Sequence, residues 1–200
     1  KDAQTITWLY SKNTDVEYRQ LLNEKATVQN ITSATRTVFA NTNTNDIIVL
    51  FFSGHGYPGG FVAYDGDLTY SQVRKSMAAS KCKNKMIFAD ACFSGKIRTN
   101  GGSSQSSVQA AKKANVMLFL SSRSNETSIE RSDMENGYFA TYLQKGLRGG
   151  ADVNRDRVIT AKELYNYVHK GVVEISRDRQ HPVMWGKFGD NMPVMVWPKK

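Results

Sequence analysis

Asp46-Ile-Ile-Val-Leu-Phe-Phe-Ser-Gly-His-Gly56 is the stretch that decides the fold. Residues 46–52, apolar from Ile47 onward, are typical of a strand in a parallel sheet that is covered on both faces. We expect the strand to end abruptly at Ser53-Gly-His-Gly56, where Gly54 and Gly56 would let the backbone turn sharply beside His55. The stretch therefore predicts a buried strand with a histidine at its carboxyl end.

A second unit of the same kind follows. Residues 85–90 form another apolar strand, and Ala91-Cys-Phe-Ser-Gly95 comes directly after it. The segment 69–80 between the two strands is predicted to be a helix, and a strand–helix–strand crossover makes the strands parallel. Functional groups collect beyond the carboxyl ends of such strands. His55 and Cys92 are therefore expected to meet as the pair that covalent catalysis by a cysteine needs.

The rest of the chain continues this alternation. Helices are predicted over 2–12, 30–39, 138–147 and 161–175, strands over 17–24, 115–120 and 194–196, and a hairpin at 61–64 with its turn at Asp65-Gly66. This order indicates an α/β fold with a mainly parallel sheet and helices on both faces. The length of 200 residues suits one domain over 1–200.

Composition narrows the function classes. The chain is 40% hydrophobic and 22% charged, as in ordinary globular proteins. No apolar run approaches the roughly 18 residues that a membrane span needs. The net charge of +9 comes from 27 basic and 18 acidic residues. The basic residues are scattered, so a solvated basic face is favoured over nucleic-acid binding.

The two cysteines have different expected roles. Cys82 precedes strand 85–90 and lies at the opposite edge of the predicted sheet from His55. We interpret it as a structural or surface thiol. The intervening strand holds Cys82 and Cys92 too far apart for a disulfide.

The residues around the catalytic pair suggest how a substrate is held. Ser53 and Asp90 lie two residues before His55 and Cys92, and residues two apart in a strand share a face. An acidic group beside the pair would select a cationic side chain; the alternative is that Asp90 caps local N–H groups. The backbone N–H groups of Gly56 and Cys92 could form an oxyanion hole.

These motifs, Phe51-Phe-Ser-Gly-His-Gly56 and Asp90-Ala-Cys-Phe-Ser-Gly95, resemble the caspase-like cysteine peptidases, most closely the metacaspases and their bacterial relatives. Further stretches similar to the sequences of this family follow at Ser121-Ser122, Glu126 to Glu130, Gly137-Tyr-Phe139, Gly149-Gly-Ala-Asp152 and Gln180-His-Pro182. The resemblance implies a caspase–haemoglobinase fold, a Cys–His dyad and cleavage after Arg or Lys. Asp2 resembles a third residue of the family's acidic pocket, beside Ser53 and Asp90.

Two departures from the family pattern matter. The family has a central strand before its first helix, whereas this sequence starts at that helix, so we expect a missing or separately cleaved upstream segment of the same protein. Many metacaspases also bind calcium through aspartates that follow the His and Cys motifs. Here only Asp65 and Asp67 follow His55, and residues 96–100 contain no acid, so no calcium is expected there.

Another loop matches most ligand positions of an EF-hand. Asp152, Asn154, Asp156 and Glu163 fit, but Arg157 stands where the loop normally has glycine. The alternative is structural, with Thr160 and Glu163 capping the next helix. We expect no metal or other cofactor, with calcium in this loop as the alternative.

The sequence thus predicts a cysteine endopeptidase acting on peptides or proteins with Arg or Lys at the cleaved position. Arg98 to Lys113 is basic and glycine-rich and is a candidate self-cleavage region. The main alternative is a catalytically silent caspase-like regulatory or interaction module. A calcium-sensing or nucleic-acid-binding domain would rest only on the weaker features above.

Overall fold

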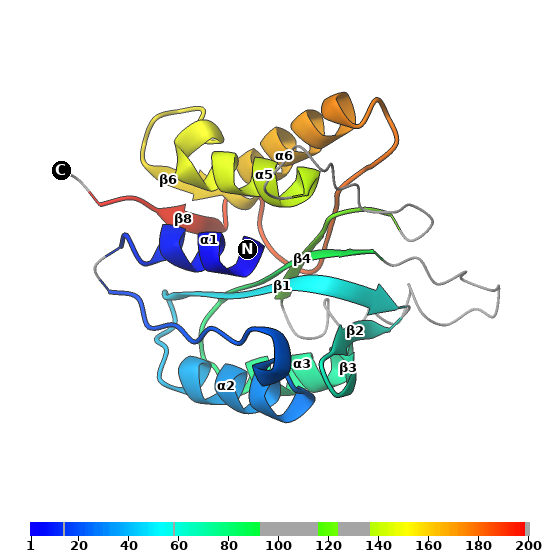
Figure 1. Ribbon diagram of the computed structural model, residues 1–200. Helices are drawn as coiled ribbons and strands as arrows, with labels where there is room; N and C mark the ends of the chain where they lie inside the picture. The colour runs from blue at the N-terminus through cyan, green and yellow to red at the C-terminus, as the bar shows by residue number, and fades with distance from the viewer. Residues whose placement is uncertain (14, 58, 93–115, 124–136, 199–200) are drawn as a thin grey trace.

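The computed structural model describes residues 1–13, 15–57, 59–92, 116–123 and 137–198. In this part of the chain a six-stranded sheet lies between two layers of helices (Figure 1). Its strand order is β3-β2-β1-β4-β5-β7. The strands are β1 (Ile47–Tyr57), β2 (Gly60–Ala63), β3 (Gly66–Thr69), β4 (Asn84–Cys92), β5 (Val116–Leu120) and β7 (Val183–Trp185).

Helices cover both faces of this sheet. One face is covered by α1 (Asp2–Tyr10), α5 (Tyr138–Lys145) and α6 (Ala161–Ile175), and the other by α2 (Val28–Ala40) and α3 (Tyr70–Ala78) (Figure 1). The side chains of β4 alternate between the two sides. Met86 and Phe88 join the core beneath α1, α5 and α6, whereas Ile87 and Ala89 join the core with α2 and α3. The predicted α/β fold with two covered faces is confirmed.

The centre of the sheet is parallel. β1 pairs with β4 from Ile47–Asn84 to His55–Cys92, and β4 pairs with β5 from Lys85–Val116 to Ala89–Leu120. The edge strand β7 runs antiparallel to β5. The sequence analysis missed β7 because its three residues, directly after Pro182, are too few to show a strand pattern.

Strand β1 is longer than predicted. It continues through Ser53-Gly-His-Gly56, and its last two residues pair antiparallel with β2. Neither Gly54 nor Gly56 has a positive φ, so the expected sharp turn beside His55 is wrong. The chain reverses instead near Gly59, where φ is 118°. His55 therefore stands on a strand rather than in a loop.

The outer edge of β1 is only partly covered. Of the residues of β1, only Gly56 and Tyr57 pair with β2. Along Ile47–His55, no strand of the described residues lies beside β1 on the side away from β4. Several apolar side chains of β1 are therefore only half-buried, whereas those of β4 are buried. An upstream strand for this position stays a prediction.

The remaining described segments complete the core. β6 (Val158–Thr160) and β8 (Pro193–Val196) form a separate two-stranded antiparallel sheet. α5 runs into the π-helical turn η2 (Gly146–Gly150). The strand predicted at 17–24 is wrong: residues 17–22 pair with no other described strand, and the 3-10 turn η1 (Asn23–Lys25) follows them.

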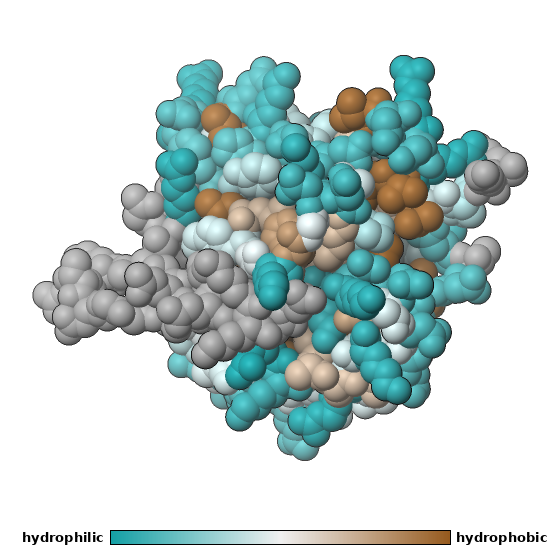
Figure 2. All heavy atoms as spheres, turned by 180° about the vertical axis from the view of Figure 1, so that it is seen from behind, coloured by the Kyte–Doolittle hydropathy of each residue, from teal (hydrophilic) through white to brown (hydrophobic). Residues whose placement is uncertain are grey.

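Figure 2 shows the molecule from behind, where the coloured surface is mostly hydrophilic, with patches of apolar side chains among the polar ones. None of the described helices has both the length and the apolar character that crossing a membrane requires.

Candidate active site

The backbones of His55 and Cys92 are neighbours across the parallel pair of β1 and β4. The two residues stand opposite each other in the register, at the carboxyl ends of both strands. Adjacent strands lie about 4.8 Å apart, so the backbone of His55 is one strand spacing away from that of Cys92. The side chain of His55 is exposed. The predicted meeting of the two positions follows from this register.

Ser53 and Asp90 form the next matching pair, two residues earlier. The Ser53 hydroxyl donates to Asp2 Oδ2 at 3.2 Å. Asp2 is the first residue of α1, and α1 packs against the sheet through Ile6 and Leu9. The fold thus brings together the three residues predicted to bind a cationic side chain.

Asp90 also supports a helix. Its Oδ2 accepts a hydrogen bond from the backbone N–H of Ala140 at 3.2 Å. Ala140 is in the first turn of α5, whose N-cap, Gly137, has no side chain to cap it. The positive end of the helix dipole favours a carboxylate here. This N–H belongs to a helix 50 residues away in the sequence, so the bond differs from the capping of local N–H groups that the sequence analysis weighed as an alternative.

The backbone before Cys92 is held by Ser121, which follows β5. The Ser121 hydroxyl accepts from the Ala91 N–H at 3.2 Å and donates to the Ala91 carbonyl at 3.1 Å. Ser121 and Ser122 are fully buried, and Ser121 supports the backbone before Cys92. The side-chain amide of Gln180 donates to the Ser121 carbonyl at 2.8 Å.

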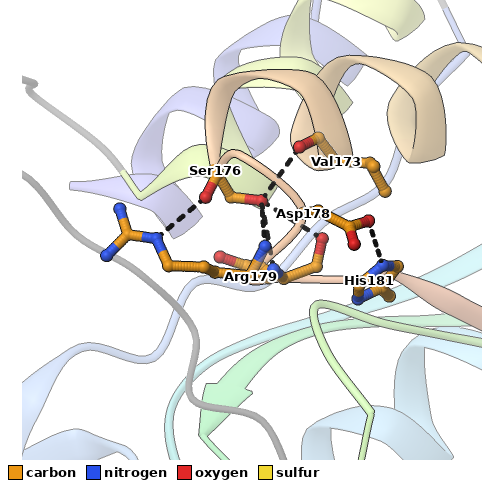
Figure 3. A network of polar contacts seen from close by, with 6 residues as sticks. Val173, Ser176, Asp178, Arg179 and His181 are labelled. Carbon is orange, nitrogen blue, oxygen red and sulfur yellow. Dashed lines mark hydrogen bonds and ion pairs between the residues drawn. The ribbon is translucent and has the colours of Figure 1, made fainter.

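Gln180 belongs to a tightly bonded turn after α6. The Ser176 hydroxyl accepts from the N–H groups of Arg179 and Gln180 at 3.2 and 3.0 Å and donates to the Val173 carbonyl (Figure 3). Arg177 and Asp178 both have positive φ, 52° and 64°. The turn therefore has a strained but well-bonded backbone.

Two further histidines lie near this turn. His181 Nε2 lies 2.9 Å from Asp178 Oδ1 (Figure 3). His169 stacks at a tilt on Tyr165 and has its ring 6.2 Å from that of His181. His169 lies within α6 and His181 follows that helix, whereas His55 lies near the end of β1.

Cys82 lies at the other end of the sheet. It is buried, and its thiol donates to the Asp46 carbonyl at 2.7 Å. Burial raises the pKa of this thiol. Cys82 is thus a structural thiol.

The comparison with protein families decides the identity. The model of the caspase domain family (peptidase C14) matches residues 1–192. This chain belongs to the caspase domain family. The match covers both candidate motifs and most of the described fold.

Solved structures agree with the caspase domain fold. Protein GSU0716 from Geobacter sulfurreducens is 17% identical with a TM-score of 0.68, over 98% of this chain and 89% of that one. Caspase-1 from Spodoptera frugiperda is 14% identical with a TM-score of 0.65, over 98% and 82%. The structure of pro-sf-caspase-1 is 17% identical with a TM-score of 0.62, over 100% and 82%. No curated protein matches the sequence.

The predicted oxyanion donors lie on the same two strands. Gly56 follows His55 and stands opposite Phe61 in the β1–β2 pair, and Cys92 ends β4. The two are offset by one position in the β1–β4 register. Their role in holding an oxyanion stays a prediction.

The EF-hand-like loop of this caspase domain is closed by its own side chains. Asp152 Oδ2 accepts from the Arg157 N–H at 3.0 Å, and Asp156 Oδ1 from the Val158 N–H at 2.8 Å. Glu163 Oε2 accepts from the N–H and hydroxyl of Thr160 at 3.0 and 2.8 Å, which makes the expected capping box.

Two further features bear on a metal in this loop. Asp152 Oδ1 is buried and has no hydrogen-bond partner. Nevertheless, within the described ranges no group of three or more His, Cys, Asp or Glu side chains could hold a metal ion.

Asp65, one of the two acids after His55, accepts a hydrogen bond from the Val28 N–H at the start of α2. The self-cleavage region 98–113 and the Glu126 to Glu130 segment lie outside the described residues.

Proposed function

We propose that this caspase domain is a cysteine endopeptidase that cleaves after Arg or Lys, with His55 and Cys92 as its catalytic dyad. One observation carries the proposal: His55 and Cys92 occupy matching positions at the carboxyl ends of two parallel strands. Membership of the caspase domain family supports the reaction class.

In the proposed reaction His55 accepts the thiol proton of Cys92, and the thiolate attacks the scissile carbonyl carbon. The C–N bond breaks, the amine leaves with the proton from the imidazolium, and a thioester remains. Water then hydrolyses the thioester and restores the thiol. The N–H groups of Gly56 and Cys92 would hold the oxyanion, each contributing about 3 kcal/mol. This chemistry needs no metal.

Specificity for a cationic side chain would come from Asp2, Ser53 and Asp90. The bonds Ser53–Asp2 and Ala140–Asp90 are made to carboxylates by a hydroxyl and an amide. Ionised carboxylates at these two positions would attract a guanidinium or ammonium group. An Asp side chain at the cleaved position would be repelled.

Substrates would be peptides or proteins, including the chain itself. Arg98, Lys112 and Lys113 bound the proposed self-cleavage region. Intact-mass analysis of wild type and Cys92→Ala during incubation tests this step. Fragments that end at a basic residue in wild type alone are expected, and an unchanged intact mass would contradict self-cleavage.

The dyad is tested with a peptidyl-arginine chloromethyl ketone, which alkylates a reactive thiolate with loss of chloride. We expect peptide mapping to find the adduct on Cys92, and not on the buried Cys82. Cys82→Ala is the matched control and should react like wild type, whereas His55→Ala should react far more slowly. Labelling of Cys92 no faster than Cys82 would favour the silent regulatory or interaction module.

A further inference from the structure

The Ser121 hydroxyl continues the sheet beyond the end of β5. The ladder between β4 and β5 ends at Ala89–Leu120. Beyond it the Ser121 N–H donates to the Ala89 carbonyl at 2.9 Å, and the Ser121 hydroxyl bonds both the N–H and the carbonyl of Ala91. One buried side chain therefore takes the place that a backbone partner would have opposite Ala91.

The carbonyl of Ala91 and the N–H of Cys92 belong to the same peptide group. A peptide group is planar and trans, so its carbonyl and its N–H point in opposite directions. A hydrogen bond that fixes the Ala91 carbonyl therefore also fixes the direction of the Cys92 N–H. It also polarises that N–H, because hydrogen bonds along a peptide group strengthen one another.

Gln180 holds Ser121 in turn. Its side chain is fully buried and its amide donates to the Ser121 carbonyl at 2.8 Å. The backbone of Gln180 is anchored by the Ser176 hydroxyl, which accepts its N–H at 3.0 Å. The turn after α6 is thereby connected to the peptide group before Cys92 through two side chains.

We propose that Ser121 and Gln180 are positioning residues that aim the Cys92 N–H at the oxyanion. The inference rests on the proposed function, because it assigns these residues to the transition state of that reaction. Donors aimed in advance at developing charge act on the transition state more than on the bound substrate. Their loss should therefore lower kcat and leave KM nearly unchanged.

The test compares Ser121→Ala and Gln180→Met with Ser80→Ala. Ser80 is a matched control: it is buried, its hydroxyl accepts the Cys82 N–H at 3.0 Å and contacts the Thr42 hydroxyl, and it lies near the opposite end of β4. We expect kcat for an arginine peptide to fall about 10- to 100-fold in the two test variants, with KM within about twofold of wild type. Ser80→Ala should keep the wild-type kcat. Equal kcat in all three variants, or a rise in KM alone, would overturn the inference.

A second measurement separates this inference from the proposed function. The backbone amide resonance of Cys92 in ¹⁵N-labelled protein reports its peptide group whether or not the protein cleaves peptides. It should shift in Ser121→Ala and Gln180→Met and stay in place in Ser80→Ala. An unmoved resonance in Gln180→Met overturns the inference even if wild type is an active peptidase. Failure of wild type to cleave any peptide overturns the proposed function, and with it the role in the reaction, while a shifted resonance would preserve only the structural link.

Discussion

The carboxylate of Asp90 accepts a hydrogen bond from the backbone N–H of Ala140. A residue proposed to bind the cationic side chain of the substrate therefore also stabilises the first turn of helix α5. A substitution that removes the carboxylate would therefore affect both cleavage and folding. The two effects can be separated, because an amide oxygen can replace a carboxylate oxygen as an acceptor but carries no charge.

Asp90→Asn is expected to lower kcat/KM for arginine peptides by about 30-fold, which corresponds to about 2 kcal/mol of lost attraction for the cation. Its thermal unfolding should stay close to wild type, because the side-chain oxygen can still accept from Ala140. Asp90→Ala should lose activity and also about 1 kcal/mol of stability. Wild-type cleavage of arginine peptides by Asp90→Asn would remove Asp90 from the specificity site.

Cys82 should make stability depend on alkaline pH. Burial is the main cause that raises the pKa of its thiol above the ordinary value of 9.0. A raised pKa means that the folded state favours the thiol, so this contribution is complete below pH 9.0 and is lost as the pH rises through the raised value. Urea unfolding at neutral and alkaline pH should show a steeper alkaline loss for wild type than for Cys82→Ala. Parallel curves above pH 9.0 would argue against a buried thiol.

Gly171 lies where α6 meets α5. A Cβ at this position would collide with the ring of Tyr142. Alanine normally stabilises a helix by about 1 kcal/mol over glycine, but here the collision should dominate and Gly171→Ala should lower stability by about 1–3 kcal/mol. The matched control is Gly189→Ala, because nothing lies within 4 Å of a Cβ built there. A Tm for Gly171→Ala at or above wild type would show that the helices can separate without cost.

Arg157 occupies the position where an EF-hand has glycine, and its φ is 71°. Arg157→Gly keeps the N–H that Asp152 accepts and should raise the free energy of unfolding by about 1 kcal/mol, because glycine adopts this conformation without strain. Lys170→Gly, the same kind of change within α6, should instead cost about 1 kcal/mol. Chemical denaturation of both variants decides the point, and a destabilised Arg157→Gly would mean that the arginine side chain matters more than its backbone.

The fold could be predicted because local patterns determine it. The apolar runs of β1 and β4 and the helix between them require a parallel crossover, and that crossover puts His55 beside Cys92. The end of β1 was predicted wrongly. Ser53-Gly-His-Gly56 contains residues typical of turns, but pairing with β4 and then with β2 keeps it extended.

The supports of the site could not be predicted. Ser121 bonds Ala91 across 30 residues, Gln180 bonds Ser121 across 59, and Ala140 bonds Asp90 across 50. No local pattern links such positions, because the contacts exist only after the strands and helices have packed. The sequence marked Ser121 and Gln180 through stretches similar to a family, and it indicated neither of their bonds.

The most direct test of the account is hydrolysis of three fluorogenic peptides that differ only in Arg, Lys or Asp at the cleaved position. The enzymes are wild type, Cys92→Ala and His55→Ala, with Cys82→Ala as the control for loss of a thiol. The account predicts cleavage of the Arg and Lys peptides alone, retained in Cys82→Ala and abolished in the two dyad variants. Cleavage that survives in Cys92→Ala, equal cleavage after Asp, or no cleavage by wild type would contradict it.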